Sequence, residues 1–362
     1  MNPLDALIST EIETTGPITV GRYMQLCLSH PKYGYYTSKQ PLGAQGDFTT
    51  APEISQLFGE LVGVWLVTVW RALGQPSPFA LVELGPGRGT LMADILRAVA
   101  VDRAFTDGCK VHLVELSKPL RDLQSKTLQS SSIAPTFHSD IASLPKLPTL
   151  FVANEFFDAL PTNQWVRTDR GWNARKIGLD ADNKLTFGVD PTPLPAPPKL
   201  IRENAALGTI VEHSPAQDTI MGMMADRIVR YGGAALITDY GSLSTGFGDT
   251  LQAVRMHRPA DPLDDPGASD LTTQTDFGHL RSKAIDAGVR TTAWSAQGDF
   301  LIAMGLLERA GVLGANAGPE ERDAISAAVE RLASDAAMGK LFKAMALASK
   351  EIHLPGLIVV ND

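Results

Sequence analysis

The chain has 362 residues, of which 44% are hydrophobic and 20% are charged, a balance that excludes a disordered or fibrous protein. Its 32 basic and 40 acidic side chains give a formal net charge of -8, which argues against a protein that coats nucleic acid or an anionic membrane. The two cysteines, Cys27 and Cys109, are too few for a disulfide framework or a zinc knuckle. By length, we expect about two or three domain-sized units.

The N-terminal region, residues 1–75, is predicted to be helical. Its first residues, MNPLDALIST, show no basic segment followed by an apolar run, so we expect a cytoplasmic protein, or one of mitochondrial-matrix type that has already been trimmed. Helical spacing surrounds Tyr23 and Cys27. A second helix is predicted to begin near Pro52 and to continue through Leu57 and Val69, because its apolar residues recur with the period of a buried helical stripe.

From Phe79 onward, short apolar runs alternate with helical segments, a pattern typical of a parallel sheet in an α/β fold. We predict a seven-stranded sheet in a core formed by residues 76–161 and 232–362. Residues 162–231 are predicted to be an inserted subdomain of hairpins and a helix, and residues 241–270 to be an irregular loop. The predicted sheet strands are residues 79–84, 110–116, 136–138, 149–153, 234–239, 289–294 and 341–347.

The most specific local feature is a glycine-rich turn in residues 81–90, LVELGPGRGT, where a strand runs into Gly85, Gly87 and Gly89 and then into a helix. The glycines permit a tight turn and let a ligand approach the backbone, and the helix start offers unpaired N–H groups. This G-x-G-x-G spacing differs from the G-x-G-x-x-G of dinucleotide sites. Glu83, just before the turn, is suited to attract an ammonium and a sulfonium, whereas it would repel a pyrophosphate.

Two further acids lie at the ends of the next predicted strands, one in the last residues of strand 110–116 and one just after strand 136–138. Glu115 is placed to accept hydrogen bonds from both ribose hydroxyls of an adenosine, and Asp140 from an adenine amino group. Because the carboxyl ends of parallel strands face one crevice, these acids and Glu83 are expected to converge there. The pattern favours S-adenosyl-L-methionine as cofactor. The plainer alternative is that the glycines form an ordinary turn and Glu115 is a surface acid.

Several longer motifs are spread along the chain. They are GPITVGRYMQLCLSHPKYGYYT (16–37), GDFTTAPEISQLFGE (46–60), VELGPGRGTLMADILR (82–97), NEFFDALP (154–161), ITDYG (237–241) and HRPADPLDDPGASDLTTQTDF (257–277). Together these motifs resemble the MidA family of class I S-adenosylmethionine-dependent methyltransferases of bacteria and mitochondria. The resemblance spans nearly the whole chain and implies a Rossmann-like sheet, an N-terminal helical region and an inserted α+β substrate subdomain.

The resemblance also carries expectations about activity and partners. The family includes the mitochondrial complex I assembly factor that methylates an arginine of a complex I core subunit, so it implies a protein arginine N-methyltransferase that supports assembly of NADH dehydrogenase. By match, the three glycines form the cofactor loop and Glu115 is the ribose acid. The implied partner is a protein substrate, with neither nucleic acid nor membrane insertion. The oligomeric state stays open.

The acceptor residues are predicted after the fourth strand, in residues 154–158, NEFFD. For methyl transfer, the enzyme must orient the acceptor and stabilise charge in the transition state. An arginine acceptor is difficult because its guanidinium is protonated and its nitrogen lone pairs are delocalised. Carboxylates can hold its N–H groups and assist proton loss. We assign Glu155 as the principal clamp, Asp158 as its second carboxylate and Asn154 as an amide acceptor. Alternatively, Asp158 caps a helix and Glu155 lies on a solvated face.

A lid over the methyl donor is a second hypothesis. Pro52 suits the start of a helix, and the charge of Glu53 in the first turn complements the helix dipole. Ordinary capping is the alternative interpretation. Tyrosines at positions 33, 35 and 36 line an acceptor channel or pack under the loop. The end of the fifth predicted strand, Asp239-Tyr240-Gly241, is a weaker acceptor candidate. The lid residues are Asp47, Thr50, Pro52 and Glu53.

The seven histidines show no H-x-x-x-H or Cys/His spacing, so no metal site is expected. Two other functions stay open. One is a small-molecule O- or C-methyltransferase that uses His138 or His257 as a base. The other is a catalytically silent assembly or binding factor with a methyltransferase fold, although the intact acids and glycines argue against a dead site.

Overall fold

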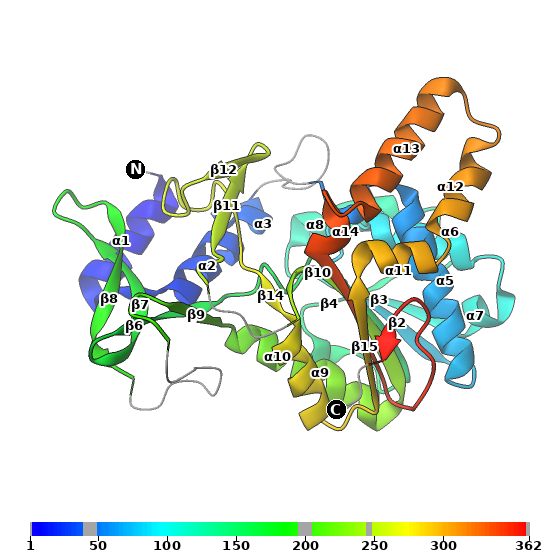
Figure 1. Cartoon of the computed structure of the whole chain (residues 1–362), viewed down its shortest axis with the longest axis horizontal. Helices are drawn as coiled ribbons and strands as arrows, with labels where there is room; N and C mark the ends of the chain where they lie inside the picture. Colours follow the sequence, from blue (N-terminus) through cyan, green and yellow to red (C-terminus); the bar gives the residue numbers. More distant parts are fainter. Residues whose placement is uncertain (1, 39–48, 195–204, 244–247, 360–362) are drawn as a thin grey trace.

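The computed structural model describes residues 2–38, 49–194, 205–243 and 248–359. Figure 1 shows two lobes. The larger lobe has a central sheet covered by helices on both faces, and the smaller one joins the N-terminal helices to two small sheets. Within the described residues, no helix is long and apolar enough to cross a membrane.

The central sheet contains all seven predicted strands, in the order β4-β3-β2-β5-β10-β16-β15. The first five run parallel to one another, and β16 is antiparallel to both β10 and β15. Their bounds are β2 (Phe79–Leu84), β3 (Cys109–Val114), β4 (Thr136–His138), β5 (Thr149–Asn154), β10 (Gly233–Ser242), β15 (Thr291–Ala296) and β16 (Phe342–Ala348).

The sheet has nine described strands rather than seven. The additional strands are β14 (Thr275–Asp276), which is parallel to β10, and β17 (Ile358–Val359), which is antiparallel to β15. Each has two residues, which is too short to produce the alternation from which a strand is predicted.

Alternate side chains of each strand enter different cores, as the two-residue period requires. Leu81 of β2 packs in a core with the helices α5, α6, α11, α12 and α13, whereas Val82 packs in the core under α9 and α10. These helices are α5 (Gln56–Ala72), α6 (Thr90–Val99), α9 (Pro215–Tyr231), α10 (Phe277–Asp286), α11 (Gln297–Ala303), α12 (Leu306–Gly314) and α13 (Pro319–Ala333).

The smaller lobe is built from three separate parts of the sequence. Strand β1 (Ile18–Thr19) pairs with β7 of the inserted region, and Leu4 and Ile8 share a core with Ile177 and Leu271. One sheet has the order β1-β7-β6-β9 with β8 on β7, and the other has the order β12-β11-β13. The bounds are α1 (Pro3–Thr15), α2 (Val20–Ser29), β6 (Asn163–Thr168), β7 (Gly171–Leu179), β8 (Leu185–Pro193), β9 (Ile210–His213), β11 (Gln252–Arg255), β12 (Arg258–Ala260) and β13 (Asp270–Thr272).

Several predictions from the sequence need adjustment. The helix expected from Pro52 is two helices, because Ser55 is extended and caps the second one. The segment 241–270, predicted to be irregular, contains the antiparallel pair β11 and β12. Helix α9 lies inside the predicted insertion but packs on the central sheet, as α5 of the N-terminal region also does. The domain boundaries themselves stay a prediction.

The remaining described elements are short. They are α3 (Tyr35–Ser38), α4 (Ala51–Ile54), α7 (Arg103–Gly108), α8 (Lys118–Thr127), the 3-10 helix η1 (Ile141–Ser143) and α14 (Met338–Leu341). Of these, α3, α4, α8 and η1 border the candidate site.

Candidate active site

A cavity of about 350 Å³ opens at the carboxyl ends of β2, β3, β5 and the strands beside them. This is the edge at which ligands of open α/β sheets bind, and the volume suits a small-molecule cofactor. The N-terminal segment contributes Ser29 and Tyr36 to its wall, and the smaller lobe contributes Asp270 and Thr272. The cavity therefore has walls from both lobes.

The glycine-rich turn lies on the cavity wall through Gly85 and Gly87, and Gly89 caps the helix α6 that follows. All three glycines have positive φ, at 59°, 55° and 83°, a conformation that side chains with a Cβ rarely adopt. A Cβ on Gly85 would also lie 2.7 Å from Cδ2 of Phe156. The backbone geometry therefore explains the glycine pattern.

Side chains of helix α8 form hydrogen bonds with this turn, and the sequence did not reveal these contacts. The buried Gln124 side chain donates to the carbonyl of Gly87 at 2.8 Å and lies 3.3 Å from Oε2 of Glu115, and Thr127 donates to the carbonyl of Arg88 at 2.8 Å. A single amide thus fixes the glycine turn relative to the acid of the neighbouring strand.

Glu83 lines the cavity and is almost fully buried, and its Oε2 has no hydrogen-bond partner. Burial, together with the nearby Glu115 carboxylate, raises the pKa of Glu83 to about 8. An unpartnered buried carboxylate oxygen carries a free-energy cost. A ligand with a cationic donor would supply the missing partner.

The other two predicted cofactor acids also line the cavity. Glu115 accepts from the backbone N–H of Ser117 at 2.8 Å, and burial raises its pKa in spite of this bond. Asp140 is exposed, and its Oδ1 caps η1 through the N–H of Ser143 at 2.8 Å. Capping and adenine binding are compatible for Asp140, because a carboxylate has several acceptor sites.

Glu155 lies on the cavity wall directly after β5, with a positive φ of 48°. Its Oε1 accepts from the N–H of Ala51 at 2.9 Å and from the Asn154 amide at 3.1 Å. Burial raises the pKa of Glu155 to about 7, although these two donors act in the opposite direction. Strained backbone and a shifted pKa in one cavity-lining acid are typical of functional residues.

Asp158 also lines the cavity and is buried beside the carboxylates of Asp239 and Asp270. Burial and these neighbouring charges raise its pKa well above the usual range. The alternative of a helix cap does not apply, because Asp158 lies in a turn rather than at the start of a helix. Its own N–H and that of Phe157 donate to Oδ2 of Asp239, at 3.1 and 3.0 Å. Asp239, in the second half of β10, therefore positions the loop that carries Glu155 and Asp158.

Asp270, the first residue of β13, completes the acidic wall. The sequence did not single it out, because the segment before it is rich in aspartate and proline. It is buried, lines the cavity and accepts from the Tyr36 hydroxyl at 2.8 Å. Of the three tyrosines considered, Tyr36 lines the cavity. Tyr240 does not belong to the wall but contacts it, through a hydrogen bond of 2.5 Å to Thr272.

Asn154 lines the cavity, but its amide is already engaged. Its oxygen accepts from Thr238 at 2.7 Å while its nitrogen donates to Glu155 at 3.1 Å. This geometry favours a positioning role for Asn154 over direct contact with an acceptor.

Three of the predicted lid residues, Thr50, Pro52 and Glu53, line the cavity, and Asp47 lies outside the described residues. Glu53 accepts from the Thr90 hydroxyl at the start of α6 at 2.6 Å. Helix α4 is therefore tied both to the helix after the glycine turn and, through Ala51, to Glu155.

No histidine belongs to the described wall of this cavity. His138 instead contacts His112 and Ser143, both at 2.9 Å, and His257 lies in the turn between β11 and β12 with a φ of 59°. The structure thus gives no support to a histidine base for a small-molecule acceptor.

Comparison with known proteins agrees with this geometry. The sequence model of the family Methyltransf_28, S-adenosyl-L-methionine-dependent methyltransferases, matches residues 61–295. The mitochondrial protein arginine methyltransferase NDUFAF7 of Mus musculus is 37% identical, over 96% of this chain and 84% of its own length. Its Drosophila melanogaster homolog is 36% identical, over 98% and 85%. The chain belongs to the MidA family of S-adenosylmethionine-dependent methyltransferases.

Solved structures support the same cofactor for this MidA member. A superfamily member from Burkholderia thailandensis, crystallised with S-adenosyl-homocysteine, is 27% identical with a TM-score of 0.84. The alignment covers 98% of this chain and 93% of that one. The residues present here fit such a ligand, because the unpartnered Glu83 oxygen, the glycine turn and Glu115 face one cavity.

Proposed function

We propose that this protein is a protein arginine N-methyltransferase whose acceptor arginine enters between Glu155, Asp158 and Asp270. The observation that carries the proposal is the wall of three carboxylates beside the glycine turn. A guanidinium presents five N–H donors in a rigid fork and is always charged, so a group of carboxylates is its natural partner. The names of the relatives, which are protein arginine methyltransferases, point to the same acceptor.

The roles of the residues follow from their contacts. When bound, S-adenosylmethionine supplies a methyl group on a positively charged sulfur. Glu155 holds the guanidinium through Oε2, since Oε1 already accepts from Ala51 and Asn154. With a pKa of about 7, Glu155 can accept the proton that the guanidinium releases near neutral pH. Asp158 and Asp270 hold the remaining N–H groups, while Asn154 and Asp239 position the loop.

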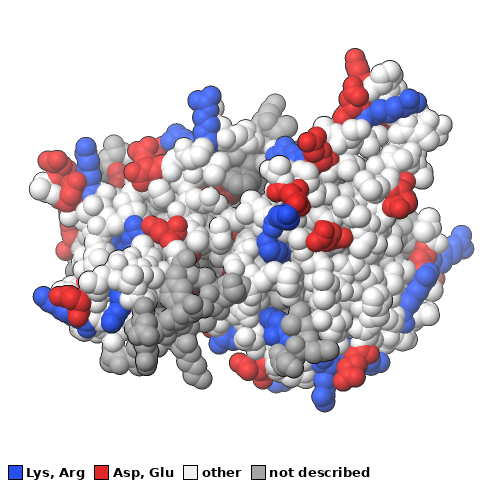
Figure 2. Space-filling model, in the orientation of Figure 1, with Lys and Arg blue, Asp and Glu red and all other residues white. Residues whose placement is uncertain are grey.

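The proposed acceptor protein is a core subunit of respiratory complex I, and methylation is proposed to support its assembly. This follows from the family resemblance. The reaction is proposed to take place in the bacterial cytoplasm, or in the mitochondrial matrix for a chain from that compartment. Figure 2 shows acidic and basic side chains interspersed on the face it draws, with no continuous basic patch outside the grey residues. The formal net charge of -8 and the names of the relatives favour a protein acceptor over nucleic acid.

The test combines acceptor identification with a variant. Cell lysate that lacks the protein is incubated with the enzyme and labelled S-adenosylmethionine, and labelled peptides are identified by mass spectrometry. We expect label on an arginine. E155Q should lower the methylation rate about 100-fold or more, because the variant loses charge that acts at the reacting nitrogen. The same variant should bind S-adenosyl-homocysteine within about threefold of wild type.

A matched control is E351Q, because Glu351 is exposed and lies outside the cavity wall. It should methylate at the wild-type rate. Full activity of E155Q with normal cofactor binding would remove Glu155 from the proposed role. Label found on a small molecule would favour the alternative methyltransferase, and cofactor binding without any labelled product would favour a silent assembly factor.

A further inference from the structure

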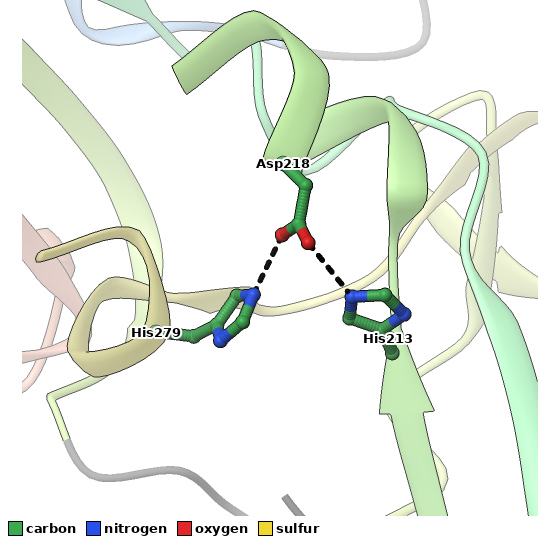
Figure 3. Close-up of side chains that lie close together, drawn as sticks. All are labelled: His213, Asp218 and His279. Carbon is green, nitrogen blue, oxygen red and sulfur yellow. Dashed lines mark hydrogen bonds and ion pairs between the residues drawn. The ribbon is translucent and has the colours of Figure 1, made fainter. Parts of the chain in front are cut away.

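A cluster of metal-binding side chains lies outside the methyl-transfer cavity, formed by His213, Asp218 and His279 (Figure 3). His213 ends β9, Asp218 lies in the first turn of α9 and His279 in the first turn of α10. Nε2 of His279 is 2.6 Å from Oδ1 of Asp218, and Nε2 of His213 is 3.2 Å from Oδ2. Among the described residues, this is the one group of three such ligands.

The geometry suits a small divalent ion. One potential ligand atom of each residue lies within 4.8 Å of those of the other two. In a tetrahedral zinc site with bonds of about 2.0 to 2.1 Å, ligand atoms are roughly 3.3 Å apart. Small shifts of the three side chains would reach that arrangement. The local spacing of histidines in the sequence could not reveal this group, because its members come from three distant elements.

There is also room for a fourth ligand. A cavity of about 90 Å³ is lined by both histidines and by the polar side chains of Gln217 and Thr250. A water molecule needs about 30 Å³ and two or more polar partners. Sites with three protein ligands commonly complete their coordination with water.

Lys283 occupies the place of a cation beside this group. Its Nζ is 2.9 Å from Oδ2 of Asp218, and its side chain is 38% exposed, so it can turn into solvent when an ion binds.

We propose that His213, Asp218 and His279 bind one divalent transition-metal ion, Zn²⁺ in the first place, with water as the fourth ligand. The ion joins the strand β9 of the smaller lobe to α9 and α10 of the larger lobe. None of its three ligands lines the large cavity, but Ile220 and Met223 of α9 do. The ion is thus a structural link between the lobes, and it is independent of the proposed arginine acceptor.

The test uses the full-length protein after removal of metal with a chelator. Zn²⁺ is titrated by calorimetry, Co²⁺ by its visible absorption, and thermal unfolding is followed with and without Zn²⁺. We expect one ion per chain, a tetrahedral Co²⁺ spectrum and a higher Tm with Zn²⁺. H213A and H279A should each weaken Zn²⁺ binding about 100-fold or more and abolish the rise in Tm.

Two further variants make the test specific. K283Q should bind Zn²⁺ more tightly than wild type, because the competing cation is gone. H353A removes an exposed histidine elsewhere and should bind like wild type. Unchanged affinity for S-adenosyl-homocysteine shows that each variant is folded. The proposal fails if folded H213A and H279A bind Zn²⁺ as the wild type does, or if the wild type binds none.

Discussion

Glu83 is the residue whose chemistry depends most directly on the ligand. Burial and the neighbouring Glu115 raise its pKa to about 8, so the carboxyl group is mostly protonated at neutral pH. A cationic ligand reverses this preference, since an opposite charge favours the ionised form. Cofactor binding is therefore coupled to release of a proton from Glu83.

This coupling predicts a pH dependence with a definite sign. Binding needs ionised Glu83, so affinity for S-adenosyl-homocysteine should rise with pH up to about 8, by at most about tenfold per pH unit between pH 6 and 8. Calorimetry in buffers of different ionisation enthalpy measures both the affinity and the released proton. E83Q should bind weakly with little dependence on pH, and a wild-type affinity that is constant from pH 6 to 8 would refute the coupling.

Some residues of the site could be predicted from the sequence, and others could not. Gly85 and Glu83 were identifiable because both the spacing of a glycine turn and the acid before it are local. Asp239 stood out only as a weaker candidate at the end of a predicted strand, because its contact with Phe157 lies far away in the chain. Gln124 acts through a similarly distant contact with Gly87, and nothing in its own sequence surroundings marks it. The same holds for Asp270, which meets Tyr36 only in the folded lobe.

Among the elements, the short helix α4 has the most direct connection to the site. It contacts Glu155 through the N–H of Ala51, and Glu53 accepts a hydrogen bond from Thr90. These two contacts make α4 a candidate lid that closes on the cofactor.

Deuterium exchange tests this lid. We expect S-adenosyl-homocysteine to slow exchange in residues 50–54, because the ligand packs against their side chains in the cavity wall. T90V removes the bond to Glu53 and should weaken ligand binding about fivefold, the equivalent of one hydrogen bond of about 1 kcal/mol. T68V, which alters an exposed threonine on α5, is the control. If the exchange rate of residues 50–54 did not change on addition of S-adenosyl-homocysteine, the result would count against a lid.

Helices α5 and α6 show how glycine sets the distance between elements. A Cβ on Gly59 of α5 would lie 2.5 Å from Cβ of Asp94 of α6, and one on Gly63 would lie 3.1 Å from Cβ of Ala98. Because α6 begins at the glycine turn, this close packing also positions the turn relative to α5.

Two alanine substitutions at helical glycines should therefore have opposite effects. G59A should lower the free energy of unfolding by about 1 to 3 kcal/mol, because the overpacking outweighs the better helix propensity. G222A in α9, where a Cβ meets nothing within 4 Å, should raise it by about 0.5 to 1 kcal/mol. Urea denaturation measures both. If G59A stabilised the protein as G222A does, the close contact would not be limiting.

For the whole molecule, the central sheet was predictable and the smaller lobe was not. The strands of the sheet are buried on both faces, so Leu81 and its neighbours form apolar runs that stand out in the sequence. The smaller lobe depends on pairing between Ile18 and Ile177 and on a core shared with Leu271. Such long-range partners leave no local period, which is why its three segments were assigned to separate regions.

The stability of the larger lobe depends on one buried carboxylate that joins three helices. Glu60 of α5 is 5% exposed and accepts from Arg97 of α6 and from Nε of Arg309 of α12 at 2.6 Å. The hydrogen bonds from the two arginines hold the pKa of Glu60 below its usual value, even though burial, the largest single influence, acts to raise it. An acid whose pKa is lower in the folded state stabilises the protein above its unfolded pKa of about 4.5.

E60Q should therefore lower the free energy of unfolding at pH 7 by about 1.5 to 3 kcal/mol, because both arginines lose a charged partner. The matched control is E11Q, since the Glu11–Arg22 pair is exposed, with side-chain exposures of 28% and 43%, and should cost less than about 1 kcal/mol. Urea denaturation at pH 7 and at pH 4 measures the free energy of unfolding of both variants and distinguishes their losses. The Glu60 contribution should shrink as the pH falls through the pKa of the folded protein and the carboxylate is protonated, so the E60Q and wild-type curves should converge. Equal losses in E60Q and E11Q at pH 7 would mean that burial adds nothing to this network.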